Sequence, residues 1–589
     1  MKIICIRTLD RDHIDCDAEA TQTTLACAAD LLREAPNSFP REQNIMEMKR
    51  AALAGLLALS TLAASGCTGR SPKEPSDRAD ATVSATTDKA AGEAGPIKWA
   101  IYRATSSLDP IKAFDIPETA VITAMCETLL VQQPDFSLTP GLATSAEYVS
   151  PTSLVLQLDK RATFWDGSPV TAEDVAFSLE RVRDPKAGGF FTTDFARVQT
   201  ISVTAEDQVT ISFSEPDYWL RGVLSAMPGI VVQKKFAELA GADLGTPSTG
   251  VMCSGPFKFS SWSSGGDVVV DRNDSYWKED AKAMVPSVTF RPVSNDANLA
   301  AAFSTGDLNG YYVAGSSVYD ELSASGKVKA TSGPSLTTDL LAIGDPSGPM
   351  GNEKLRQAVS LAVDRSAYIN QVYSGQATVP TSVSSSSTWG YGKQVFEDEL
   401  GKAEPLKQDI EKAKSLVAET GMQGKTIKMV VASGLVTGQI MAAVLKEALE
   451  NIGLKLELQT ISLDKYNELF FDPAARTGVD VFVTVNNPIA PDPAPLLASI
   501  GTPDGAYNFS GWSNSEVVKL LDQSRITADE NERARLVAEA DKLITSGLPQ
   551  IPMAHPYNVL YLDNTLSGAP ASYSFAAGPW ANFIGKAAK

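Results

Sequence analysis

Four carboxylates lie close together in one short stretch of the chain, residues 164–182, which reads FWDGSPVTAEDVAFSLERV. They are Asp166, Glu173, Asp174 and Glu180. Acids at this spacing could act as a general acid and base, or could bind a cation. The same residue types also start helices and shape turns, so the local pattern must decide between catalysis, cation binding and scaffolding.

The pattern around these acids is that of a turn followed by the start of a helix. Thr171 and Asp174 have the spacing of a capping box, in which each side chain pairs with the backbone N–H of the other residue. Val170 and Val175 have the spacing of a hydrophobic staple, and residues 166–169 (DGSP) are typical of a turn. Each acid therefore has a structural role, and we expect no catalysis here.

The composition predicts an acidic globular protein with several domains or lobes. A chain of 589 residues is too long for one ordinary core. Apolar residues make up 43% and charged residues 21%, as in ordinary globular proteins. The formal net charge of −19 and the absence of a basic run argue against nucleic acid as a partner.

Residues 48–66 predict a secretory signal peptide. Lys49 and Arg50 precede an apolar run at 51–62, which is too short to span a membrane. Small residues then precede Cys67, and this arrangement resembles a bacterial lipobox. We expect Cys67 to be lipidated after cleavage. The alternative is an ordinary cleaved signal in which the cysteine has no role.

Two segments beside this signal are not expected to enter a packed core. Residues 1–47 are polar and precede a complete signal, so we expect that they are not part of the natural chain. Residues 67–95 begin with the expected lipidated cysteine and continue with small and polar side chains, which predicts a flexible tether. No second apolar segment of about 18 residues follows, so we expect no membrane span in the body.

Two cysteines remain in the expected mature body, Cys126 and Cys253. The sequence contains no CxxC pair, which excludes the zinc and redox motifs built on that spacing. In an oxidising compartment the two cysteines could form a disulfide. Two independent buried thiols remain an equally good interpretation of the sequence.

Several short segments from residue 96 onward predict strands. Residues 153–158 (SLVLQL) form one candidate. Residues 201–213 alternate on both sides of a polar turn, and residues 257–271 do so around a Gly-Gly pair. Both patterns predict β-hairpins.

The clearest structural unit in the sequence is a strand–helix–strand segment in the C-terminal half. Residues 427–432 predict a strand, residues 438–453 a helix with one apolar face, and residues 454–461 the next strand. This order implies parallel strands joined by a right-handed crossover. Residues 479–485 add a buried strand, so this region is predicted to be a doubly wound α/β lobe.

The stretch at 164–182 resembles the signature of the family 5 solute-binding proteins, which are the peptide- and nickel-type receptors of ABC importers. Further segments match the same family in order, from residue 96 to the C-terminus. Among them are SLDP at 107–110, residues 255–277, residues 355–377 and PQIPM at 549–553. The resemblance implies an α/β, two-lobed, periplasmic-binding-protein-like fold (type II-like, with an extra domain) that closes on its ligand.

The resemblance also implies a discontinuous first lobe. Lobe I is expected to comprise residues 96–115, 245–335 and 555–589, with an extra domain at 116–244, and lobe II residues 336–554. The expected function is that of a substrate-binding protein, anchored by lipid to the outer face of the cytoplasmic membrane, that captures oligopeptides and delivers them to ABC permease subunits. The alternative is the same receptor fold binding an opine-like compound, a sugar or a metal chelate.

Neither an enzyme nor a cofactor or metal site is expected, and we expect a monomer. The sequence contains no GxSxG, HExxH, GxGxxG or Walker pattern. After residue 66 the only histidine is His555, which leaves little for a catalytic triad or a direct metal site. A lone histidine is more often packed or hydrogen-bonded than a ligand.

Ligands of α/β proteins usually bind at the carboxyl ends of strands, and Asn486 and Asn487 directly follow the strand at 479–485. Their amides could contact a ligand, although Asn-Asn-Pro could also be simply a turn. In the peptide receptors of family 5, which this chain resembles, this place often has a tryptophan and, three residues later, an aspartate. That aspartate pairs with the α-ammonium of the peptide. This chain has Asn486 and Ile489 there, so the ammonium partner is missing. Either another acid substitutes, or the ligand is not an ordinary free-amine peptide.

The remaining candidate ligand-binding residues come from other segments. They are Ser106, Ser107, Trp389, Tyr391, Asn508 and His555. The aromatic pair at 389 and 391 could stack on a ligand or could pack within its own loop. Asn508 lies in a segment that matches the family and could face the cleft.

Overall fold

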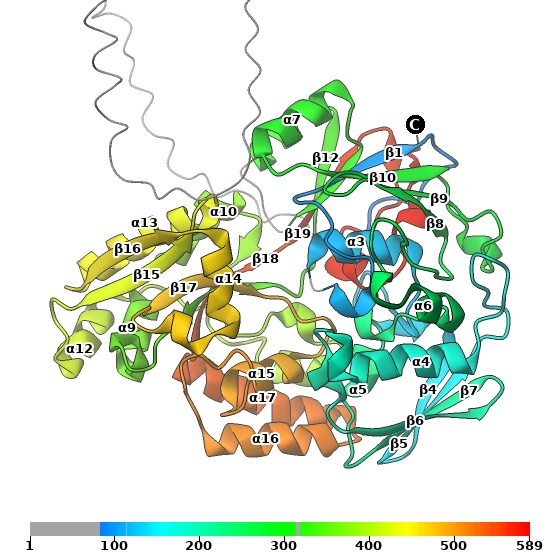
Figure 1. Ribbon diagram of the computed structural model, residues 1–589. Helices are drawn as coiled ribbons and strands as arrows, with labels where there is room; N and C mark the ends of the chain where they lie inside the picture. The colour runs from blue at the N-terminus through cyan, green and yellow to red at the C-terminus, as the bar shows by residue number, and fades with distance from the viewer. Residues whose placement is uncertain (1–82, 114, 314–317, 589) are drawn as a thin grey trace, which may run out of the picture. The chain divides into compact units, whose positions relative to one another are not determined.

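The computed structural model describes residues 83–113, 115–313 and 318–588 (Figure 1). The expected signal peptide and Cys67 lie outside the described residues. None of the helices in the described part of the chain has the length and apolar character that crossing a bilayer requires.

A seven-stranded sheet forms the centre of the part that we call lobe I, residues 83–333 and 558–588. Its strands are, in spatial order, β12 (Val328–Gly333), β19 (Asn558–Asp563), β11 (Gly310–Val313), β1 (Ile97–Ile101), β10 (Ser287–Pro292), β9 (Val268–Arg272) and β8 (Phe257–Trp262). β1 runs parallel to both β10 and β11, and the remaining pairs are antiparallel. β8 and β9 are the hairpin predicted at 257–271, which is confirmed.

A six-stranded sheet forms the centre of lobe II, residues 338–556. Its order is β14 (Ala377–Thr378), β18 (Gln550–Pro556), β13 (Thr338–Ile343), β17 (Val481–Asn486), β15 (Thr426–Ala432) and β16 (Lys455–Ile461). β15, α13 (Val436–Asn451) and β16 form the predicted βαβ unit, with both β16 and β17 parallel to β15. β13 runs antiparallel to β17 and to β18, so the sheet is mixed rather than purely parallel.

Helices cover both faces of the lobe II sheet, because successive strand residues point to opposite faces. Leu341 and Met429 pack on one face, together with α9 (Glu353–Ala362), α10 (Arg365–Tyr373), α12 (Ile410–Thr420) and α13. Leu340 and Val430 pack on the other face, against α14 (Leu463–Phe471). A separate core joins α11 (Lys393–Glu399), α15 (Pro493–Gly501), α16 (Ser515–Ile526) and α17 (Glu530–Gly547).

A second, antiparallel sheet of lobe I lies within the residues for which the sequence predicts an extra domain. Its order is β4 (Ala143–Ser150), β5 (Ser153–Leu158), β7 (Gln208–Phe213) and β6 (Val198–Ala205). The strand expected at 153–158 and the hairpin expected at 201–213 are thereby confirmed. Leu156 and Ile211 of this sheet share one continuous core with Val175 and Leu179 of α4 (Ala172–Arg183) and with the seven-stranded sheet.

Two acids of the 164–182 stretch, Asp166 and Asp174, hold a turn and a helix start, as the sequence indicates. The Thr171 hydroxyl accepts a hydrogen bond from Asp174 N at 3.2 Å, and the Asp174 carboxylate accepts one from Thr171 N at 3.0 Å, which completes the capping box of α4. Asp174 also accepts a hydrogen bond from Lys234 N at 2.8 Å, at the start of α6 (Lys234–Ala240). Asp166 accepts from Ser168 N at 2.9 Å within its turn.

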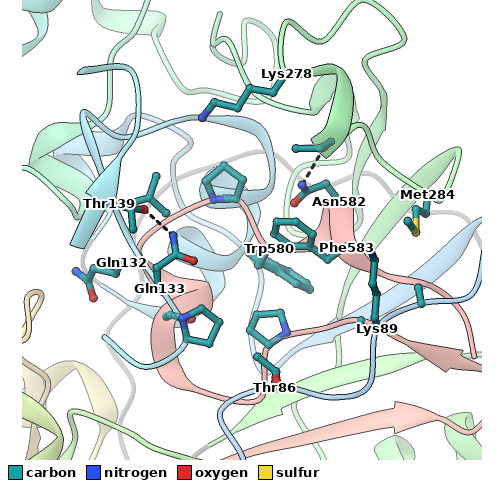
Figure 2. A pocket seen from close by; sticks show the side chains of 18 of the residues that line it. Thr86, Lys89, Gln132, Gln133, Thr139, Lys278, Met284, Trp580, Asn582 and Phe583 are labelled. Atoms are coloured by element: carbon teal, nitrogen blue, oxygen red, sulfur yellow. Dashed lines mark hydrogen bonds between the residues drawn. The ribbon is translucent and has the colours of Figure 1, made fainter. Parts of the chain in front are cut away.

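The N-terminal residues of the described chain differ from the expected tether. Residues 83–95 lie along lobe I, where Ser84 N donates to Ser332 O at 2.9 Å and Ala91 N donates to Lys586 O at 2.7 Å. Residues 86–90 also line a cavity of this lobe (Figure 2). The prediction relied on the lack of large apolar side chains in this segment, but backbone hydrogen bonds to neighbouring strands do not require them.

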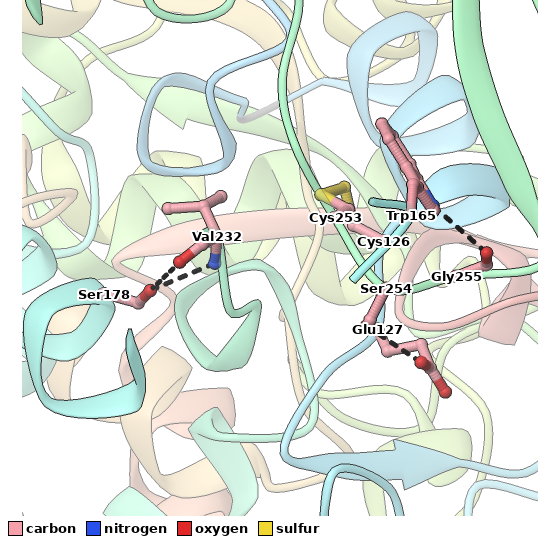
Figure 3. Close-up of a disulfide and its surroundings, with 8 residues drawn as sticks. All are labelled: Cys126, Glu127, Trp165, Ser178, Val232, Cys253, Ser254 and Gly255. Atoms are coloured by element: carbon pink, nitrogen blue, oxygen red, sulfur yellow. Dashed lines mark hydrogen bonds between the residues drawn. A yellow bond between two sulfur atoms is a disulfide. The ribbon is translucent and has the colours of Figure 1, made fainter. Parts of the chain in front are cut away.

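Cys126 and Cys253 form a disulfide (Figure 3). Cys126 follows directly after α3 (Ile116–Met125), and Cys253 lies shortly before β8. Both cysteines are fully buried. The next residue, Glu127, accepts hydrogen bonds from Ser254 Oγ at 2.9 Å and from Tyr276 OH at 2.8 Å, so the two joined segments are also held together by polar contacts.

Candidate functional site

Two short chain segments connect lobe I with lobe II. Residues 334–337 lead from β12 to β13, and Tyr557 alone leads from β18 to β19. β12 pairs with β19 and β13 pairs with β18, so the two crossings lie side by side. Two adjacent short connections between compact lobes can act as a hinge.

Asn486 and Asn487 lie next to this hinge. Asn486 ends β17, is buried, and donates from Nδ2 to Gln550 Oε1 at 2.7 Å. Asn487 is exposed, and its Oδ1 accepts a hydrogen bond from Thr337 Oγ1 of the first crossing at 2.7 Å. The Asn-Asn pair is therefore more than a turn, because its two amides hold the end of β17 to β18 and to the hinge.

Ile489 belongs to a loop of lobe II that contacts lobe I. Its carbonyl accepts a hydrogen bond at 2.8 Å from Nε2 of Gln132, a buried residue of β2 (Leu130–Gln132). The Ile489 side chain is half-buried against the core of lobe I. This position therefore supplies an apolar side chain and a backbone acceptor, and no carboxylate.

Trp389 and Tyr391 lie beside the same loop. Gly390 N donates to Pro491 O at 3.0 Å, and Tyr391 OH donates to Asp492 Oδ1 at 3.1 Å. The Trp389 ring stacks on that of Phe396, with centroids 5.6 Å apart. Trp389 Nε1 is buried and has no hydrogen-bond partner among the described residues. The aromatic segment is thus packed, and this indole N–H is its unused donor.

Asp492 is the acid nearest to Ile489 in the sequence, and one of its carboxylate oxygens has two structural partners. Its Oδ1 accepts from Ala494 N at 2.9 Å at the start of α15, in addition to the bond from Tyr391. Burial raises the pKa of Asp492 to about 6. Asp492 is therefore a buried acid whose Oδ1 already serves α15 and Tyr391.

Ser106 and Ser107 are held by contacts within their own part of lobe I. Ser106 donates from both N and Oγ to Glu118 Oε1, each at 2.7 Å. Glu118 also binds the Arg103 guanidinium at 2.7 Å. Ser107 Oγ accepts a hydrogen bond from Asp109 N at 3.1 Å. Arg103 was not predicted as a site residue, because its ion pair with Glu118 joins residues more than ten positions apart.

Asn508 and His555 are the last two candidates. Asn508 donates to Thr502 O at 2.8 Å and to Trp512 O at 2.7 Å, so its amide fixes its own loop. His555 is buried in β18, where it pairs in register with Thr378. Burial lowers the pKa of His555 to about 4, which keeps its imidazole neutral at pH 7. The structure thus brings the residues at 389, 391 and 486–489 together, while the serines and Asn508 lie in local networks.

A second set of contacts between the lobes was not predicted. Arg525 of α16 lies 2.6 Å from the carboxylate of Asp217, which is almost fully buried, and 4.9 Å from the Trp219 ring centroid. Arg221 of α5 (Leu220–Val223) forms an exposed pair with Glu530 of α17 at 2.7 Å. Figure 1 shows α5 beside the helical group of α15, α16 and α17. No sequence motif marks these pairs, because their members are about 300 residues apart.

In the described part of the chain, no three side chains of His, Cys, Asp or Glu lie where they could hold an ion together.

The family model described as bacterial extracellular solute-binding proteins, family 5 Middle, matches residues 137–508. The matched residues make up more than half of the chain. The chain belongs to this family. Family 5 solute-binding proteins serve in transport and are not enzymes. This family 5 protein is 24% identical to the periplasmic oligopeptide-binding protein OppA of Salmonella typhimurium LT2, over 77% of its own chain and 85% of OppA.

Solved structures of this family 5 fold are similar over nearly their whole length. The ABC transporter substrate binding protein CtaP of Listeria monocytogenes has a TM-score of 0.72 and 20% identity, covering 84% of this chain and 99% of CtaP. AgaA of A. tumefaciens R10 in complex with agropinic acid has a TM-score of 0.71 and 21% identity, with the same coverage. These similarities confirm the predicted two-lobed α/β fold. OppA is named for oligopeptides, whereas AgaA was solved in complex with agropinic acid, so the fold alone does not decide the ligand.

Proposed function

We propose that this protein is a lipid-anchored extracytoplasmic receptor of an ABC importer, which captures oligopeptides between its lobes and delivers them to permease subunits. The observation that carries this proposal is the pair of adjacent crossings at 334–337 and Tyr557, with the 486–492 loop beside them. Lobes joined in this way can rotate and enclose a ligand. The similarity to OppA supports the choice of oligopeptides.

Asn487 is the residue that we place first in ligand binding. Thr337 N and the Ser335 hydroxyl are joined by a hydrogen bond, and Ser335 Oγ donates to Thr337 Oγ1 at 2.9 Å. The Thr337 hydroxyl proton is therefore directed to Asn487 Oδ1. These hydrogen bonds fix the side-chain amide of Asn487, so that its Nδ2 is the group left for a ligand. An N–H donor beside the hinge suits a peptide carbonyl.

A second candidate function is supported by Ile489. A receptor for ordinary free-amine peptides needs a partner for the α-ammonium, and at this position the chain has an isoleucine packed against lobe I. The nearest acid, Asp492, already accepts two hydrogen bonds. The alternative ligand is therefore a solute without a free ammonium group, such as an opine-like compound, a sugar or a metal chelate.

Native mass spectrometry of gently purified protein and a thermal-shift screen of peptides and metabolites together test this proposal. A true ligand at one hundred times its Kd should stabilise the protein by about 2.7 kcal/mol, which raises Tm, and should compact it in solution scattering. A co-purifying free-amine peptide would support the oligopeptide reading and show that Ile489 does not exclude such ligands. The receptor proposal fails if no compound raises Tm or compacts the protein.

Replacing Cys67 with serine should release the protein from the membrane fraction of its host. The thiol is the expected acylation site, and one apolar anchor is lost when it is absent. Fractionation of cells and intact-mass measurement check this, with the wild-type protein as the control. If the serine variant stays in the membrane fraction as the wild-type protein does, the proposal of lipid anchoring at Cys67 is wrong. The ligand proposal is then unaffected.

A further inference from the structure

Lobe I contains a cavity of about 570 Å³ that is lined entirely by its own segments (Figure 2). These segments are residues 86–90, 131–140, 276–284 and 568–583. No residue of lobe II lines it. Small-molecule sites commonly have volumes of about 300–1,000 Å³. The cavity therefore has the size of a ligand site, and one of its lining residues, Gln132, also bonds the Ile489 carbonyl of the loop beside the hinge.

Much of the cavity wall is apolar and aromatic. Trp580, Phe583, Tyr276 and Met284 contribute to it, together with several prolines. Trp580 is fixed, because its Nε1 donates to Ala120 O at 3.0 Å and its ring packs within an aromatic cluster. A rigid aromatic wall favours a flat apolar ligand, since little side-chain freedom is lost on binding.

One residue that lines the cavity has a buried acceptor without a partner. Asn582 is almost fully buried, and its Nδ2 donates to Ala281 O at 2.9 Å, which sets the direction of the amide. Its Oδ1 is buried without a hydrogen-bond partner among the described residues. Figure 2 shows this oxygen turned away from the Ala281 bond, among the side chains that line the cavity. An N–H or O–H group that reaches it would satisfy the acceptor.

The charges of the lining favour an anion. Lys89 and Lys278 line the cavity, and no aspartate or glutamate does. Lys278 Nζ lies 3.0 Å from the carboxylate of Glu127, so its charge is largely compensated. Lys89 is exposed at the rim and takes no part in the ion pairs of the described residues. In a protein with a net charge of −19, a recess with a cation and no acid is a selective place for a negative group.

We propose that this cavity is a second binding site, for a flat and mostly apolar organic anion such as an aromatic carboxylate. Its anionic group would lie at Lys89, its apolar body against Trp580 and Phe583, and a donor would point toward Asn582. This site is independent of solute capture between the lobes, so either proposal can fail without the other.

The fluorescent probe 1-anilinonaphthalene-8-sulfonate tests the site, because it combines an aromatic body, an anionic group and an N–H donor. We expect saturable binding at one site per chain, with a rise in Tm that shows binding to the folded protein. Lys89→Glu should weaken binding at least tenfold, and Met284→Trp should do so by filling the cavity. Lys235→Glu is the matched control, since Lys235 is exposed in α6 and does not line the cavity.

Equal weakening by Lys89→Glu and Lys235→Glu would overturn the proposal, because the effect would then reflect overall charge alone. Wild-type affinity in both Lys89→Glu and Met284→Trp would overturn it as well, since the probe would then bind elsewhere. Lys89→Glu changes only an exposed side chain, so a folding defect is not expected to obscure the result. The absence of any saturable binding to the wild-type protein would also refute the site.

Discussion

Replacing both Cys126 and Cys253 with alanine is expected to lower the free energy of unfolding by about 5 kcal/mol. The disulfide closes a loop with a sequence separation of 127 residues, and in the chain-entropy model a long loop gives the greatest restriction of the unfolded chain. Because both sites are fully buried, alanine is preferred to serine, which would bury a hydroxyl. Urea denaturation measures the change.

The reducing agent dithiothreitol provides the control for this experiment. The wild-type protein should lose stability when reduced and approach the double variant, while the variant should not respond. Two results together would contradict the disulfide. The urea midpoint of the wild-type protein would not change with dithiothreitol, and peptide mapping under non-reducing conditions would find Cys126 and Cys253 as free thiols.

Replacing Arg525 with alanine is expected to weaken ligand binding on the order of a hundredfold to a thousandfold. The change leaves the Asp217 carboxylate buried without its cation, which costs about 3–5 kcal/mol for a buried pair. We expect opening of the lobes to separate α16 from Asp217 and to return this carboxylate to water, so this cost should fall on the closed state in which a ligand is enclosed. Calorimetry with the ligand found by native mass spectrometry measures the affinity, and solution scattering measures the degree of closure.

Arg221→Ala is the matched control, because it removes the other ion pair between the same two regions. Arg221 and Glu530 are both more than a third exposed, and such pairs contribute about 0–1 kcal/mol. Affinity should therefore fall less than about fivefold. If the two variants weaken binding equally, burial of Asp217 does not control closure.

Local signals in the sequence predict the local structure well. The capping box at Thr171 and Asp174, the hairpin at 257–271 and the βαβ unit around α13 all depend on residues that are near one another in the chain. The family resemblance adds the two-lobed arrangement, which local periodicity alone does not provide. The mixed character of the lobe II sheet was missed because β13 and β18 are each more than 60 residues away in the chain from β15, β16 and β17.

The candidate site is predictable only in part, because its geometry depends on distant partners. The sequence places Asn486, Asn487 and Ile489 just after a strand, and in the structure this segment lies beside the hinge. It does not reveal that Thr337 fixes Asn487, or that Gln132 holds the Ile489 carbonyl from the other lobe. Burial of Asp217 beside Arg525 has no sequence signal at all, since neither residue type nor spacing marks it.

The course of residues 83–95 has a mechanical consequence. The backbone of this segment forms hydrogen bonds with Ser332, Ala569 and Lys586, all in lobe I. Any force on the chain upstream of residue 83 therefore acts first on lobe I, and it reaches lobe II through the two short crossings and the contacts between the lobes. If Cys67 is lipidated as we propose, the membrane anchor acts on lobe I, and we expect lobe II to be the lobe that moves on closure.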